Sequence, residues 1–149
     1  MRIVTIDIFV CVAILVATFY VDSYLSVGWA QAFVLDRIFP VTFGWIYWSF
    51  LIEWLYVASY FFAVGVLVAM LVRARNPGPW AAAVGVCFSL TYLILQTTQT
   101  SAHASGEPGD IAFYVWRYGQ YAVGPIAAFA GACVAQRIRM RRNRADAAA

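Results

Sequence analysis

The sequence predicts an all-α polytopic membrane protein, a bundle of four transmembrane helices with both termini in the cytoplasm. Its composition is the first reason, since 64% of the 149 residues are hydrophobic and 11% are charged, with a mean hydropathy of +0.76. Soluble domains are about 45–50% apolar and about 25% charged. Four apolar runs of membrane-spanning length are the second reason, and the placement of the arginines is the third. The length suits one domain, which we expect at residues 1–142, followed by a disordered tail at 143–149.

The first predicted helix covers residues 3–21. Crossing a hydrocarbon core of about 30 Å takes about 20 apolar residues, close to the length of this run. A signal peptide has a similar run, but here only Arg2 precedes it, Asp7 interrupts its start and no clear cleavage site follows. We therefore expect a retained helix with Asp7 at the interface.

A longer segment, residues 22–47, precedes the second predicted helix at 48–72. It contains "VGWAQAFVLDRIFP", whose apolar positions fit a helix at the interface or over the bundle mouth, ended by Pro40. The stretch "RARNPGPW" then predicts a short turn, because its Pro and Gly end one helix and Pro79 suits the start of the next.

The third predicted helix covers residues 80–98 and the fourth covers 118–136. Between them, residues 99–117 contain "SAHASGEPGD", which is typical of a flexible turn. The halves of the helices nearer the predicted cytoplasmic side are rich in small residues, as in "AAFAGACVA". Small residues favour close packing of membrane helices.

All ten basic residues are arginines, and they are distributed unevenly. With four spans, Arg2, Arg73, Arg75 and the five arginines after residue 136 fall on one side, and Arg37 and Arg117 on the other. The positive-inside rule places the richer side in the cytoplasm. This accounts for the basic tail, so we expect no nucleic-acid partner. Arginine-only usage favours the bacterial inner membrane over the endoplasmic reticulum.

Cysteine and histidine usage predicts no metal site and no cofactor. The three cysteines, Cys11, Cys87 and Cys133, stand singly in apolar runs, and His103 is the sole histidine. Without a C-x-x-C pair or metal-ligand spacing, the cysteines are best interpreted as small buried apolar residues.

The candidate functional groups are two acidic residues in the predicted membrane helices. Glu53 is the one ionisable group in "FLIEWLYVASYFF", and Asp22 ends the first helix on the same side of the membrane. A carboxylate at mid-membrane costs about 2.5–3.5 kcal/mol on insertion scales, so such groups usually face the bundle interior. The alternative is a glutamate that reaches the interface or hydrogen-bonds a neighbouring helix.

Polar and aromatic groups accompany these acids in the outer half of the bundle. Tyr92, Gln96 and Gln99 share one face of the third helix. The remaining candidates for ligand contacts are Trp54, Tyr56, Tyr60, Tyr114, Arg117 and Tyr121. They predict an aromatic pocket with two acids. Interhelical hydrogen bonding is the competing interpretation.

Two uses of the acid pair stay open. Burial disfavours the charged form of a carboxylic acid, so a neutral Glu53 beside an ionised Asp22 suits general acid–base catalysis. The same pair can instead hold a ligand's ammonium group, with cation–π attraction from the rings. Arg117 can also neutralise one acid, which makes the site structural.

Three segments carry a family resemblance. "TFYVDSYL" and "SFLIEWLYVASYFF" are similar to the ligand-site segments of the EXPERA superfamily, four-helix membrane proteins that include sterol isomerases and sigma-two-type receptors. The third, "GEPGDIAFYVWRYGQYAVGP", is similar to the last helix of the isomerases. The resemblance implies ligand-site acids at Asp22 and Glu53. The second catalytic glutamate of the isomerases falls near Thr98 or Gln99, so the resemblance favours the receptor-like pair.

Three functions follow as hypotheses. The first is an intramembrane site for a sterol- or isoprenoid-like ligand, whose isomerisation or cyclisation Glu53 and Asp22 would catalyse if the protein is an enzyme. The second is a proton-coupled exporter of lipophilic cations, which requires a homodimer. The third is a non-catalytic subunit or scaffold. The expected partners are a lipophilic small molecule and membrane lipids.

Overall fold

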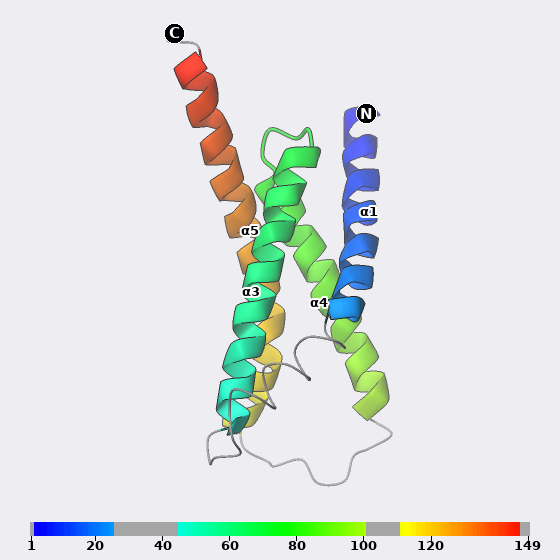
Figure 1. Ribbon diagram of the computed structural model, residues 1–149. Helices are drawn as coiled ribbons and strands as arrows, with labels where there is room; N and C mark the ends of the chain where they lie inside the picture. The colour runs from blue at the N-terminus through cyan, green and yellow to red at the C-terminus, as the bar shows by residue number, and fades with distance from the viewer. Residues whose placement is uncertain (1, 26–44, 101–110, 147–149) are drawn as a thin grey trace.

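The computed structural model describes residues 2–25, 45–100 and 111–146, and these form four helices. The helices are α1 (Arg2–Leu25), α3 (Trp45–Leu71), α4 (Gly78–Thr100) and α5 (Ile111–Asp146). Figure 1 shows that both termini and the short turn between α3 and α4 lie at one end of the bundle, which we call the turn end. The opposite end, where α1 ends and α3 begins, is called the far end.

The all-helical fold and the four predicted helices are confirmed. In the described part of the chain, three stretches are long and apolar enough to cross a membrane: Thr5–Ser23, Glu53–Leu71 and Tyr121–Asp146. Within the described residues, the apolar stretch of α4 is shorter, Gly78–Ile94. Its 17 residues rise about 25 Å, the lower limit for a span. The helices are those of an integral membrane protein.

The fourth helix is longer than its predicted range of 118–136. It begins at Ile111 and continues to Asp146, so residues 143–146, expected in a disordered tail, are helical. No Gly or Pro follows Gly131, and arginine is a good helix former, so nothing in the sequence stops the helix. The predicted interface helix falls largely on residues 26–44 and the predicted flexible turn on 101–110, both outside the described residues.

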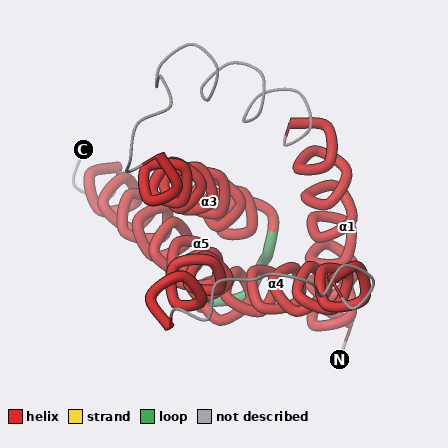
Figure 2. The backbone as a smooth tube through the Cα atoms, turned by 90° about the horizontal axis from the view of Figure 1, so that it is seen from below, coloured by secondary structure: helices red, strands yellow, loops and turns green. Residues whose placement is uncertain are grey.

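Helix α5 packs most extensively against α3 and then against α4 (Figure 2). Glycines permit the closest approach: a Cβ on Gly65 would overlap the Ala128 carbonyl, and one on Gly131 would overlap the Phe62 carbonyl. Because both residues are glycines, the backbones of α3 and α5 come into direct contact at these two points. This agrees with the small residues of the sequence and with close packing in membranes.

Helix α1 lies at the edge of the bundle, against α4 and α3 (Figure 2). Its Asp7 side chain is 2% exposed and accepts a 3.0 Å hydrogen bond from the backbone amide of Arg73 in the turn. On the other side of the turn, the Gln136 side-chain amide donates a 2.9 Å hydrogen bond to the Arg75 carbonyl. Both α1 and α5 therefore hold the α3–α4 turn in place.

Large apolar side chains cover the outside of the bundle. Phe9 is 71% exposed, Met70 72% and Ile126 69%. The interior holds Val68, Ala81, Ala128 and Ala132, which are fully buried, together with the large rings of Phe61 and Phe88. Small residues where the helices meet and large apolar residues outside are typical of a protein in a hydrocarbon solvent.

Candidate functional site

Two tyrosine hydroxyls of α3 reach α1 near the far end. Tyr56 and Tyr60 are four residues apart and share one face of the helix. The Tyr56 hydroxyl donates a 3.2 Å hydrogen bond to Oδ1 of Asp22, and the Tyr60 hydroxyl donates a 2.8 Å hydrogen bond to the Thr18 carbonyl. The two rings stack with their centroids 5.9 Å apart. Since Thr18 and Asp22 are also four residues apart, one face of α1 supplies both acceptors.

The polar groups of this contact have partners within the protein. Thr18 is 4% exposed, and its hydroxyl donates a 2.7 Å hydrogen bond to the Ile14 carbonyl. Among the described side chains, no buried nitrogen or oxygen lacks a hydrogen bond. Asp22 is half-buried. A carboxylate has about four lone-pair sites, so Asp22 keeps acceptor capacity beyond its bond to Tyr56.

An aromatic cluster, Phe19, Phe61, Phe88, Tyr92 and Tyr121, adjoins these hydrogen bonds and draws on all four helices. The Phe88 ring stacks on Phe19 at 4.4 Å and meets Phe61 edge-on at 4.9 Å. Tyr92 lies 6.1 Å from Phe88 and 6.2 Å from Tyr121, measured between centroids. These separations are those of favourable aromatic pairs. The cluster joins the helices where the predicted site residues meet.

The two predicted acids lie on different helices, Asp22 on α1 and Glu53 on α3. Asp22 contacts the Tyr56 hydroxyl directly. Glu53 is on an exposed part of α3, whereas Asp22 is half-buried between helices. Asp22 is therefore the more enclosed of the two acids.

Trp54 takes part in a different contact. A Cβ on Gly119 would overlap the Trp54 indole, so this ring packs directly on the backbone of α5. Residues two apart on a helix do not share a face, so Trp54 and Tyr56 belong to different sides of α3. Tyr121 joins the aromatic cluster, and Tyr118 lies 6.2 Å from it.

The other predicted ligand contacts lie outside what can be described. Gln96 and Gln99 fall in the last turns of α4, and Tyr114 and Arg117 in the first turns of α5. Their backbones are helical, but their side chains are outside the described part of the structure.

Sequence reasoning missed the three phenylalanines that connect the site. The sequence does contain a signal for Phe88, because it precedes Tyr92 by four residues and so lies on the same face of the helix, one turn away. Thr18 likewise precedes Asp22 by four residues and shares its face of the first helix. Phe19 and Phe61 had no such signal, because phenylalanine is common on every face of a membrane helix.

The site chemistry is that of carboxyl and phenol groups beside aromatic faces. Among the side chains that the structure describes, no three His, Cys, Asp or Glu residues gather as metal ligands. Cys11, Cys87 and Cys133 are free thiols. Such a site can accept hydrogen bonds, attract a cation or exchange a proton. No protein-family model, curated protein or solved structure matches the chain.

Proposed function

We propose that this integral membrane protein binds a lipophilic, sterol- or isoprenoid-like ligand at the far end of its bundle. The observation that carries the proposal is the Asp22–Tyr56 hydrogen bond beside an aromatic cluster built from all four helices. A carboxyl group at membrane depth is costly and marks a functional site by default. Asp22 would be the polar anchor for a cationic or hydrogen-bond-donating group of the ligand.

The surrounding groups fit a ligand with a cationic head and an apolar body. Tyr56, whose hydroxyl contacts Asp22, stacks with Tyr60, and a cation within about 6 Å of an aromatic ring face is attracted to it. Phe19 and Phe88 provide apolar contact farther into the bundle. A polar anchor at Asp22 with apolar contacts deeper in the bundle resembles the ligand site of the EXPERA superfamily. Membership of that superfamily is part of the proposal.

Catalysis is an extension of the same site. A protonated Glu53 would give its proton to an alkene carbon, forming a C–H bond and leaving a carbocation, which the tyrosine faces stabilise. Loss of a proton from a neighbouring carbon to the Asp22 carboxylate would place the double bond elsewhere. The outcome is isomerisation, or cyclisation when a second alkene attacks the cation first. General acid catalysis of this kind typically contributes about 10²–10⁴-fold.

The test is ligand binding by purified protein in detergent. A panel of amphiphilic amines and neutral sterols is screened by thermal shift, and co-purifying lipophilic molecules are identified by mass spectrometry. We expect an amine or sterol to raise the melting temperature of the wild type, and Asp22→Asn to remove that shift. Tyr20→Phe, a polar substitution at an exposed position of α1, is the control. Equal shifts for both variants contradict the assignment of Asp22.

A scaffold is the second candidate, and a specific observation favours it. The hydroxyls of Tyr56 and Tyr60 on α3 already have acceptors on α1. Joining these two helices would be a sufficient role for these polar groups, with no ligand involved. In that case Asp22→Asn lowers stability and no compound in the panel shifts the melting temperature. Stability measured without ligand separates this outcome from lost binding.

A proton-coupled exporter of lipophilic cations is the third candidate, favoured by two acids on neighbouring helices, Asp22 on α1 and Glu53 on α3, which could exchange protons. It predicts pH-driven uptake of a fluorescent lipophilic cation into proteoliposomes, and a homodimer in the same detergent. Glu53→Gln would abolish the pH dependence. We propose the bacterial inner membrane as the location, with the turn end in the cytoplasm.

A further inference from the structure

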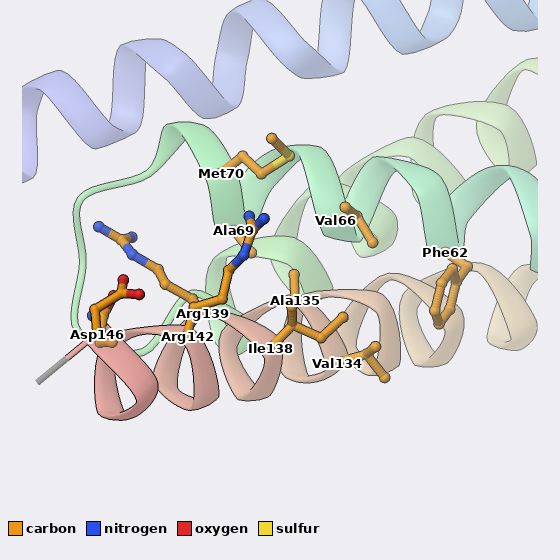
Figure 3. Close-up of a pocket in the computed structure, with 11 residues that line it drawn as sticks. Phe62, Val66, Ala69, Met70, Val134, Ala135, Ile138, Arg139, Arg142 and Asp146 are labelled. Carbon is orange, nitrogen blue, oxygen red and sulfur yellow. The ribbon is translucent and has the colours of Figure 1, made fainter. Parts of the chain in front are cut away.

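A groove of about 830 Å³ runs between α3 and α5 on the outside of the bundle, toward the turn end. Figure 3 shows apolar side chains from both helices along it, with Phe62, Val66 and Met70 on α3 and Ile138 on α5. Phe62 and Met70 are eight residues apart, about 12 Å along the helix. The groove therefore offers an apolar track that runs parallel to the helices.

One end of the groove is basic. Arg139 and Arg142 line it there, together with Asn143 and Asp146 (Figure 3). The single acid does not cancel the charge, because residues 137–146 carry five arginines and one aspartate. The α3–α4 turn adds the exposed Arg73 and Arg75 at the same end of the bundle (Figure 1).

The change from apolar to basic lining coincides with the expected membrane surface. The apolar lining ends at Ile138, where the arginine-rich turns of α5 begin. These turns extend beyond the α3–α4 turn (Figure 1). An apolar track within the bilayer that ends in arginines at the headgroup level matches the polarity of a phospholipid. Basic pockets between membrane helices on the cytoplasmic side bind anionic headgroups.

We propose that this groove binds one anionic phospholipid, with an acyl chain along α3 and α5 and its phosphate on Arg139 and Arg142. The charge of the groove selects an anionic headgroup, since two guanidinium groups form bidentate, charge-assisted hydrogen bonds with a phosphate. The apolar track selects a membrane lipid over free phosphate. This site is separate from Asp22, so it stands whether or not the proposed function does.

The experiment is native mass spectrometry of the full chain released from micelles that contain equal amounts of phosphatidylglycerol and phosphatidylcholine. We expect one phosphatidylglycerol retained on the wild type, with an apparent affinity at least tenfold above that for phosphatidylcholine. The double variant Arg139→Gln/Arg142→Gln should reduce the retained phosphatidylglycerol about tenfold, the effect of one strong charge-assisted contact.

The matched control is Arg141→Gln/Arg144→Gln, which removes the same charge from exposed arginines that do not line the groove. It should retain phosphatidylglycerol as the wild type does. Equal loss in both double variants shows attraction to the basic helix in general and overturns the site. Equal retention of the two lipids also overturns it, as does a lipid-free dimer that occupies the groove.

A second variant tests the apolar track. Val66→Trp fills the groove beside α5 while leaving the arginines intact. It should weaken retention of a long-chain phosphatidylglycerol and leave binding of water-soluble glycerol phosphate unchanged. If glycerol phosphate binds the wild type as tightly as the lipid does, the site is an anion site and the lipid assignment is wrong.

Discussion

The hydroxyl of Tyr56 on α3 lies 3.2 Å from Oδ1 of Asp22 on α1, and it donates a hydrogen bond to that carboxyl group. The two residues are 34 positions apart in the chain, and the segment between α1 and α3 includes residues 26–44, outside the described part. Helix α1 lies at the edge of the bundle, where the Tyr60–Thr18 hydrogen bond and the Phe19–Phe88 stack also hold it. The Tyr56–Asp22 hydrogen bond is therefore both a helix contact and the centre of the candidate site.

We predict that Tyr56→Phe and Asp22→Ala are energetically coupled. A hydrogen bond between membrane helices contributes about 0.6 kcal/mol on average and up to about 1.7 kcal/mol. A double-mutant cycle on the free energy of unfolding in mixed micelles should give a coupling in that range. Tyr20→Phe is the control on α1, because Tyr20 is 78% exposed. Coupling of the same size between Tyr20 and Asp22 would show that the cycle reports something other than the hydrogen bond.

We predict that Phe88→Leu destabilises the bundle by about 1–3 kcal/mol, because the Phe88 ring forms two aromatic pairs with other helices and each such pair adds about 0.5–1.5 kcal/mol. Those pairs join α4 to Phe19 of α1 and Phe61 of α3. The measurement is again the free energy of unfolding. Phe9→Leu, at a position 71% exposed on the bundle surface, should change it by less than about 0.5 kcal/mol. Similar costs for both variants would contradict a central role for Phe88.

We predict that the two substitutions of Asp7 differ. Asp7→Ala leaves the Arg73 amide without its acceptor and should cost about 1–3 kcal/mol, whereas Asp7→Asn keeps a side-chain oxygen and should cost less. The measurement is thermal unfolding of each variant beside the wild type. If Asp7→Asn proves as costly as Asp7→Ala, the negative charge matters more than the hydrogen bond.

We predict that Gly65→Val separates α3 from α5. Its side chain would meet the Ala128 carbonyl, and forcing extra groups into a packed contact costs about 1–3 kcal/mol. Ala63→Val is the matched control, since it also adds a branched side chain to α3 but at an exposed position. The ratio of folded to unfolded protein across a denaturant series measures both. Equal stability of the two variants would contradict the close helix approach.

Much of this architecture follows from the sequence because a hydrocarbon solvent restricts the choices. A run of about 20 apolar residues must form a helix, since its backbone groups have no other partners. The turn at Pro77 and Gly78 has the expected residues for a helix start. The same reasoning failed at residues 137–146, where arginine-rich sequence was read as a tail although nothing in it breaks a helix.

The site was harder to predict, because it depends on which faces meet. Asp22, Tyr56 and Tyr60 could be chosen from their polarity and spacing, and the structure brings them together. Trp54 was chosen for the same reason, yet it packs on Gly119. Periodicity assigns residues to faces of one helix, but it does not say which neighbour each face meets. Phe19 and Phe88 show this most clearly, since their contact joins helices that are not adjacent in the chain.

We predict that the turn end is cytoplasmic, because eight of the ten arginines lie on that side in the predicted topology. The test uses a background in which the three cysteines are replaced by alanine, with one new cysteine at a time. Asn76→Cys in the α3–α4 turn and Arg144→Cys in α5 should resist a membrane-impermeant maleimide in intact cells and react after permeabilisation. Ser23→Cys, near the far end, should react in intact cells.

The three positions separate orientation from fold. An inverted protein would expose Asn76→Cys and Arg144→Cys in intact cells and protect Ser23→Cys, so the positive-inside prediction would be wrong while the bundle stands. Labelling of Asn76→Cys and Arg144→Cys from opposite sides would instead contradict the arrangement in which the turn and the end of α5 share one end of the bundle (Figure 1). It would also contradict the phospholipid groove, which needs the arginines of α5 beside Met70 of α3.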